Sequence, residues 1–120
     1  MNMLGDCIKT GDFKAEKHVP VIVAPSKVKK GEWFEVEVSV GKDIPHPNLI
    51  EHHIAWIELY AIPDGAQYIV RIGRYEFSPT LEEPFIKAKI KLEKNSKLLA
   101  LSYCNIHGLW EGTTEVTVEE

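Results

Sequence analysis

Short segments in which apolar and polar residues alternate recur along the chain, and they limit it to a β fold. Residues 34–40 place Phe and three Val at every second position, and residues 86–92 alternate Ile, Ala and Leu with lysines. A period of two puts all the apolar side chains on one face of a strand. Residues 54–62 are almost continuously apolar and end at Pro63-Asp64-Gly65, which is typical of a buried strand followed by a turn.

Extending this pattern predicts about seven short strands separated by turn residues, and no segment keeps a helical period for long. The predicted strands are residues 19–24, 34–40, 54–62, 67–77, 86–92, 98–103 and 114–118. Such spacing favours an antiparallel β-sandwich or barrel. The chain has 120 residues and shows no repeat or linker, so we expect a single domain spanning residues 1–120.

Charge and composition exclude several classes of partner. The formal net charge is −4, from 18 acidic and 14 basic residues, which argues against nucleic acid as a ligand. No apolar run approaches the roughly 18 residues of a membrane span. The first ten residues lack the pattern of a signal peptide, so a cytoplasmic location is expected. Lysines cluster in two segments, which we interpret as solvated strand faces and turns: Lys27, Lys29 and Lys30, and Lys87, Lys89, Lys91, Lys94 and Lys97.

Histidine and cysteine residues gather in and beside the segments predicted to be loops. His107 follows Cys104 at a spacing of three, which lets a thiolate and an imidazole bind one ion at little cost in loop closure. His46 and His52 flank a loop rich in Pro and Asn, and a long loop in a small β domain is often functional. Neighbouring strand residues face opposite ways, so only one of His52 and His53 is expected at a common centre, and periodicity leaves open which.

Together these residues predict a metal site, although each has a simpler interpretation alone. Cys104 by itself would be a small buried apolar residue, and Glu16-Lys17 an exposed charge pair. Structural zinc sites usually join two ligand pairs, and Cys104-His107 has no matching second pair. Copper sites of this type usually have an axial Met, but both methionines lie in the first three residues. Several imidazoles, one thiolate and room for a carboxylate favour redox-active iron.

Four motifs within residues 11–110 resemble those of superoxide reductases. They are Glu-Lys-His-Val-Pro at 16–20, Ile-Pro-His-Pro-Asn at 44–48, Glu-His-His-Ile at 51–54 and Ser-Tyr-Cys-Asn-Ile-His-Gly at 102–108. The chain is similar to the one-iron, neelaredoxin type and to the catalytic domain of desulfoferrodoxin. The resemblance implies an all-β, immunoglobulin-like fold of seven strands, which agrees with the strand count.

The resemblance also implies a mononuclear non-haem iron centre, with one Fe(2+)/Fe(3+) per chain. Four histidine nitrogens and one axial cysteine sulfur would bind it: His18, His46, His52, His107 and Cys104. Glu16 matches the carboxylate that binds in the ferric resting state, and Lys17 matches the lysine beside the open coordination position. His53 falls outside this ligand set.

The implied activity is the reduction of superoxide to hydrogen peroxide, without release of oxygen, by electrons from an external donor such as rubredoxin. Two-iron relatives carry an N-terminal rubredoxin-like cysteine module. This chain has only Cys7 there, so we expect a single iron and an inert Cys7. The oligomeric state stays open, although one-iron relatives are often homotetramers.

Three alternative functions differ from this prediction in measurable ways. A dismutase would evolve oxygen from superoxide without a reductant. A cupredoxin-like electron carrier would bind copper, and its redox cycle would not need Glu16 or Lys17. A β-sandwich binding module would contain no metal.

Overall fold

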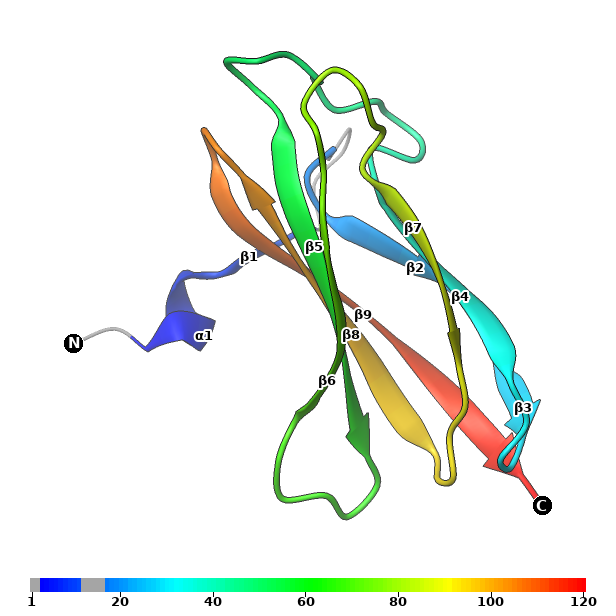
Figure 1. Ribbon diagram of the computed structural model, residues 1–120. Coiled ribbons are helices and arrows are strands. Elements are labelled where there is room, and N and C mark those ends of the chain that lie inside the picture. The colour runs from blue at the N-terminus through cyan, green and yellow to red at the C-terminus, as the bar shows by residue number, and fades with distance from the viewer. Residues whose placement is uncertain (1–2, 12–16) are drawn as a thin grey trace.

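Two β-sheets face each other in the computed structural model, which describes residues 3–11 and 17–120 (Figure 1). The larger sheet has the strand order β1-β9-β8-β5-β6, with β3 also paired to β9, and the smaller has the order β2-β4-β7. The elements of the described part are α1 (Leu4–Cys7), β1 (Lys9–Thr10), β2 (Pro20–Val23), β3 (Lys27–Lys29), β4 (Phe34–Val40), β5 (Ile54–Pro63), β6 (Val70–Glu76), β7 (Phe85–Ile90), β8 (Ser96–Cys104) and β9 (Gly108–Glu119).

The core lies between the sheets because β4, β5, β7 and β8 bury alternate side chains along most of their length. On β4 the fully or nearly buried residues are Val36, Val38 and Val40, and β5 contributes Ile57 and Leu59 from the opposite sheet. These residues belong to one apolar cluster that continues to the end of β8. Removal of this apolar surface from water drives the two sheets together.

All seven predicted strands are present, and the all-β class is confirmed. The prediction for residues 114–118 was too short, because β9 pairs with β8 from Ser96↔Val116 to Cys104↔Gly108. The expectation of purely antiparallel pairing was also incomplete. The short strands β1 and β3 both pair in parallel with β9, and neither was predicted. They contain two and three residues, so they depend on the hydrogen-bonding edge of β9 rather than on a pattern of their own.

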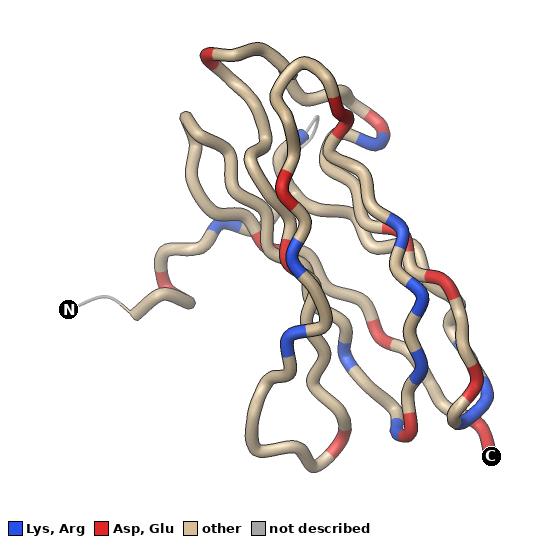
Figure 2. The backbone as a smooth tube through the Cα atoms, viewed as in Figure 1, with Lys and Arg blue, Asp and Glu red and all other residues tan. Residues whose placement is uncertain are grey.

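The lysine-rich segment on β7 is a solvated strand face, as expected. Figure 2 shows basic residues following β7 along one side of the molecule. Lys87 lies 4.0 Å from a carboxylate oxygen of Glu35 and 3.8 Å from one of Glu37, both on the neighbouring strand β4. Exposed pairs of this kind contribute little to stability. In the described ranges, no helix has the length and apolar character that crossing a membrane requires.

The segments that carry the histidines meet at one end of the two sheets. This end is at the top in Figure 1, where the β4–β5 loop, the β8–β9 turn and the chain entering β2 come together. The β5–β6 and β7–β8 turns lie at the opposite end. The fold therefore brings together residues that are as far apart in sequence as 18 and 107.

Candidate metal centre

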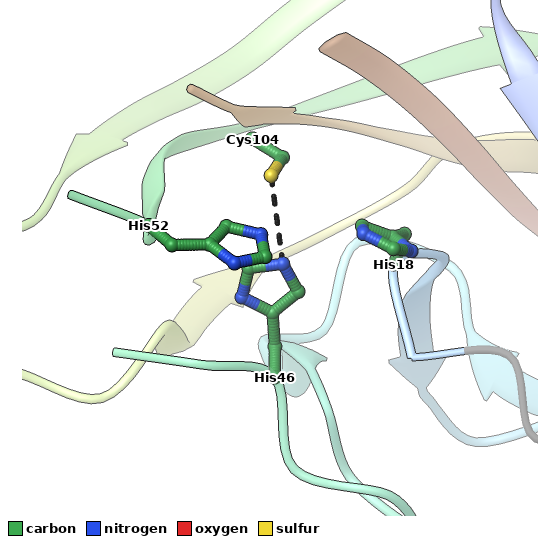
Figure 3. Close-up of side chains that lie close together, drawn as sticks. All are labelled: His18, His46, His52 and Cys104. Atoms are coloured by element: carbon green, nitrogen blue, oxygen red, sulfur yellow. Dashed lines mark hydrogen bonds between the residues drawn. The ribbon is translucent and has the colours of Figure 1, made fainter. Parts of the chain in front are cut away.

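Three histidines and one cysteine converge at the loop end of the molecule. One potential ligand atom from each of His18, His46, His52 and Cys104 lies within 4.8 Å of all the others (Figure 3). His107 adjoins this group: its Nδ1 is 3.1 Å from Nε2 of His18 and 3.7 Å from Sγ of Cys104. The structure thus brings together the four histidines and the cysteine that the resemblance implies as metal ligands, whereas the implied carboxylate ligand, Glu16, lies outside the described residues.

Cys104 lies where this cluster borders the apolar core. It is the last residue of β8, and its side chain is fully buried at the edge of the apolar core. The backbone N–H of His107 donates to the Cys104 Sγ at 3.4 Å, because three turn residues return the chain to Gly108, opposite Cys104. Gly108 has φ +83°, which favours glycine. An N–H aimed at sulfur stabilises the thiolate, the form that binds metals.

His46 is held by a loop whose sequence restricts its backbone. Prolines on both sides fix the neighbouring φ angles, and residues before proline avoid helical conformation. At Gly41, which has φ +87°, a Cβ atom would stand 2.6 Å from the His46 backbone nitrogen, so only glycine fits there. The His46 Nδ1 lies 2.7 Å from the Pro47 carbonyl, which can only accept, so Nδ1 carries the proton. Its Nε2 is then unprotonated and faces the Cys104 sulfur at 3.5 Å.

The surroundings lower the pKa of two imidazoles, those of His46 and His52. Burial lowers the pKa of His46 to about 4, and the nearby His18, His52 and Lys17 charges act in the same direction. The hydrogen bond to Pro47 opposes this shift. Burial also lowers the pKa of His52, followed by the effects of His107 and Lys17. Neutral imidazole is the form that binds metals, so this end of the molecule is prepared for a cation.

His52 provides an independent test of whether a metal fits. Its Nε2 is buried and has no hydrogen-bond partner among the described residues. Leaving a buried polar nitrogen unsatisfied costs about 1–3 kcal/mol, and a bound metal would satisfy it. Four imidazole nitrogens with one thiolate form a donor set suited to a transition metal. The residues present therefore fit a metal ion.

His53 points into the loop instead of joining the cluster. Its Nδ1 lies 3.0 Å from the Leu49 carbonyl oxygen and 3.1 Å from that of Ile50. Both partners only accept, so Nδ1 donates and the ring braces the loop. Of the two adjacent histidines, only His52 reaches the common centre, which resolves the alternative that periodicity left open.

His18 is positioned by the ends of β8 and β9. The hydroxyl of Ser102 donates to the His18 carbonyl at 3.2 Å. The indole of Trp110 stacks on the His18 ring, with ring centroids 4.6 Å apart, and its Nε1 donates to the His107 carbonyl at 3.2 Å. The sequence motifs had not identified Trp110 as part of the site. Its position three residues after His107 was the available signal.

Of the two charged residues implied at the site, the structure describes only Lys17. Glu16 lies outside the described residues. Lys17 is partly buried and directly precedes His18. Its charge contributes to the lowered pKa of both His46 and His52, so the ammonium group acts electrostatically on the cluster.

A second polar side chain anchors the β4–β5 loop on the side away from Cys104. The Asn48 amide donates to the Glu82 carbonyl at 2.9 Å, and its oxygen accepts from the Thr80 backbone N–H at 2.8 Å. Thr80 has φ +69°, a strained angle for a β-branched residue. This contact fixes the loop that bears His46 and His52 to the β6–β7 connection.

Comparison with known proteins agrees with this arrangement. The family model described as Desulfoferrodoxin matches residues 10–113. A superoxide reductase from Pyrococcus horikoshii is 54% identical over 117 residues, covering 95% of this chain and 99% of the relative. A crystal structure from Thermotoga maritima superposes with a TM-score of 0.94 at 51% identity, covering 100% of both chains. The superoxide reductase (neelaredoxin) from Ignicoccus hospitalis gives 0.91 at 45% identity, covering 98% and 100%.

The family match spans most of the chain, and the relatives agree with it in sequence and in fold. The clustered histidines and the buried cysteine lie within the matched residues. The chain therefore belongs to the desulfoferrodoxin family, whose relatives include the superoxide reductases and neelaredoxins.

Proposed function

We propose that this chain reduces superoxide to hydrogen peroxide at a single mononuclear iron. The proposed ligands are the Nε2 atoms of His18, His46 and His52, the Nδ1 atom of His107 and the Cys104 thiolate. The observation that carries this proposal is the cluster of four ligand atoms from His18, His46, His52 and Cys104 within 4.8 Å of one another, with the His107 Nδ1 beside two of them. Within it, the buried His52 Nε2 has no hydrogen-bond partner among the described residues. The superoxide reductases among the relatives support the choice of substrate.

Each protein residue has a distinct part in this chemistry. Iron, when bound, supplies the single electron that superoxide takes up. Cys104 holds a negative charge on a soft sulfur at the floor of the site, stabilised by the His107 N–H. The lowered pKa of His46 and His52 favours their neutral rings, and hydrogen bonding and packing orient the imidazoles, so their lone pairs need little reorganisation. Two protons complete the peroxide, and we assign their delivery to water near Lys17 or to solvent.

Glu16 and Lys17 complete the proposed site. Superoxide is an anion and the chain has a net charge of −4, so a local positive charge is needed to attract it. Lys17 can supply this charge, because it already acts on His46 and His52. Glu16 is proposed as the carboxylate ligand of the ferric state, since a hard oxygen suits the more highly charged ion.

The direct test is to measure the metal content of the purified protein and then add superoxide to the reduced form. We expect one iron per chain and a visible thiolate-to-iron charge-transfer band that appears as peroxide forms. Oxygen evolution in the absence of a reductant would instead identify a dismutase. Copper in place of iron would identify an electron carrier, and a protein free of metal would remove the proposal.

Replacing Lys17 with alanine should slow the capture of superoxide and flatten its dependence on salt. The attraction of a lysine for a small anion approaching through solvent is screened over about 8 Å at physiological ionic strength. The rate of superoxide reduction should therefore be measured across ionic strengths by fast mixing. Lys27→Ala is the matched control, because Lys27 lies on the exposed strand β3 and pairs only loosely with Glu119 at 3.9 Å. Equal rates and equal salt slopes in both variants would contradict steering by Lys17.

Four further statements remain predictions. We propose a rubredoxin-like protein as the electron donor and a single iron-binding domain over residues 1–120. A cytoplasmic location suits the two cysteines, which are both free. For the assembly we propose a homotetramer, supported by the exposed start of the described chain, where Met3 before α1 and Leu4 in α1 are 71% and 74% accessible and a second copy would cover them. Light scattering of the purified protein tests the assembly.

A further inference from the structure

Asn105, which directly follows Cys104, uses every polar group of its side chain to hold the neighbouring loop. Its Oδ1 accepts from the His53 backbone N–H at 2.8 Å, and its Nδ2 donates to the Glu51 carbonyl at 3.1 Å. Its own backbone N–H donates to the His53 carbonyl at 3.2 Å. One residue of the β8–β9 turn thus makes three hydrogen bonds to the two residues that flank His52.

These bonds continue the pairing of β5 with β8 past the point where the strands separate. The regular register ends at Ile54↔Cys104. Beyond it the β4–β5 loop turns away, and among the described residues the Asn105 N–H is the one backbone group of the β8–β9 turn that still bonds residues 51–53. The carboxamide of Asn105 has the same donor and acceptor groups as a peptide bond, and it takes the place of the missing backbone partner.

The residue bracketed by these bonds is the one whose ring most needs fixed placement. His52 lies between Glu51 and His53, and its backbone makes reciprocal hydrogen bonds with Leu49 of 3.2 and 2.8 Å. Its buried Nε2 faces the cluster without a hydrogen-bond partner in the described part of the chain. A small rotation of the backbone at residues 51–53 would turn this nitrogen away from the Cys104 sulfur.

We propose that Asn105 is a positioning residue for the metal centre, because it couples the His52 backbone to the Cys104 turn. It contributes no donor atom to the metal. It fixes the relative placement of two ligands that are 52 residues apart in sequence. The inference rests on the metal site proposed above, and it concerns the geometry of that site rather than its reaction.

The test compares Asn105→Ala with Asn95→Ala in the iron-loaded protein. Asn95 is a matched control, because its Oδ1 likewise accepts a backbone N–H, that of Val118, at 2.7 Å. It lies in the β7–β8 turn at the far end of the molecule. Both substitutions remove side-chain hydrogen bonds to backbone groups of a neighbouring segment. If Asn105 has a purely structural role, both variants should therefore have a lower unfolding temperature, and their metal centres should not differ from each other.

We expect the Asn105→Ala variant to bind iron about 10–100-fold more weakly in chelator competition, the range typical of lost outer-shell contacts. Its charge-transfer band should shift, whereas the Asn95→Ala variant should keep the wild-type affinity and band. Asn105→Asp retains the acceptor for the His53 N–H and loses only the donor to Glu51. The iron affinity of this variant should lie between those of the wild type and the alanine variant. It replaces the alanine variant in the test if that variant does not fold.

The outcomes separate the two proposals. A wild-type protein that binds no iron would overturn the proposed metal site, and the positioning role with it. A wild-type protein that binds iron, together with unchanged affinity and spectrum in both Asn105 variants, would overturn the positioning role alone. Equal losses in the Asn95 and Asn105 variants would also overturn it, because the effect would then be one of general stability.

Discussion

Replacing Cys104 with serine should remove the thiolate-to-iron charge-transfer band and lower superoxide reduction by more than about 100-fold, beyond what outer-shell changes cost. The sulfur lies 3.5 Å from the His46 Nε2 and 3.7 Å from the His107 Nδ1, and it accepts the His107 N–H. A serine hydroxyl stays protonated at neutral pH and is a harder donor, so it cannot take the place of a thiolate. Visible spectra and fast-mixing kinetics with superoxide measure both effects.

Cys7→Ser provides the control for this substitution. Cys7 is exposed at the end of α1, whereas Cys104 is buried. The Cys7 variant should keep the band, the rate and the stability of the wild type. Survival of the band in the Cys104 variant would show that the sulfur does not bind the metal. Loss of the band in both variants would point to a general effect of cysteine substitution rather than to ligation.

Replacing Gly112 with alanine should destabilise the protein by about 3 kcal/mol or more, at the upper end of overpacking costs. Gly112 is buried on β9, and a Cβ atom there would overlap the carbonyl oxygen of Pro20, the first residue of β2. The backbones of the two strands approach each other at this point. The atom that the Cβ would overlap is a backbone oxygen, so no flexible side chain can move aside to make room. The clash must push the start of β2 outward, and His18 lies only two residues before it.

Urea unfolding of the metal-free protein measures the loss of stability, and chelator competition measures the displacement of His18. Gly5→Ala is the control, since a Cβ at Gly5 in α1 meets no atom within 4 Å. Stability within about 0.5 kcal/mol of the wild type in the Gly112 variant would contradict the close approach of β2 to β9. A loss of stability with unchanged metal affinity would show that His18 does not depend on this contact.

The sequence pattern predicted the fold best where each strand buries alternate residues of its own. β4 matches the predicted residues 34–40 because its alternation is strict and the core needs that face. β9 was underestimated because Gly108 and Gly112 interrupt its pattern, and its first half is held by pairing with β8. β1 and β3 were missed because their only support is the edge of β9, a contact between segments distant in the chain.

The same distinction applies to the candidate site: residues in local sequence patterns could be predicted, and residues that act through contacts distant in sequence could not. Spacing and loop composition indicated His46, Cys104, His107 and one of His52 and His53, because metal-binding residue types that recur at short spacings are an unusual pattern. Asn105 gave none, since an asparagine in a turn is ordinary. Its importance depends on where residues 51–53 pass, more than 50 positions earlier. The choice of Nε2 in His46 depends likewise on the Pro47 carbonyl, whose direction only the folded loop defines.

Because the neighbouring strands and the site residues pack against β9, the position of β9 in the chain affects when the metal can bind during synthesis. β9 is the last of the described strands in chain order, and it pairs with β1, β3 and β8. His107 directly precedes it, Trp110 within it stacks on His18, and Gly112 within it closely approaches Pro20 at the start of β2. A nascent chain that ends before β9 would carry all five donor residues without the strand against which the β8–β9 turn and the start of β2 pack. Metal loading should therefore follow translation, and a ribosome-bound intermediate should have little affinity for iron.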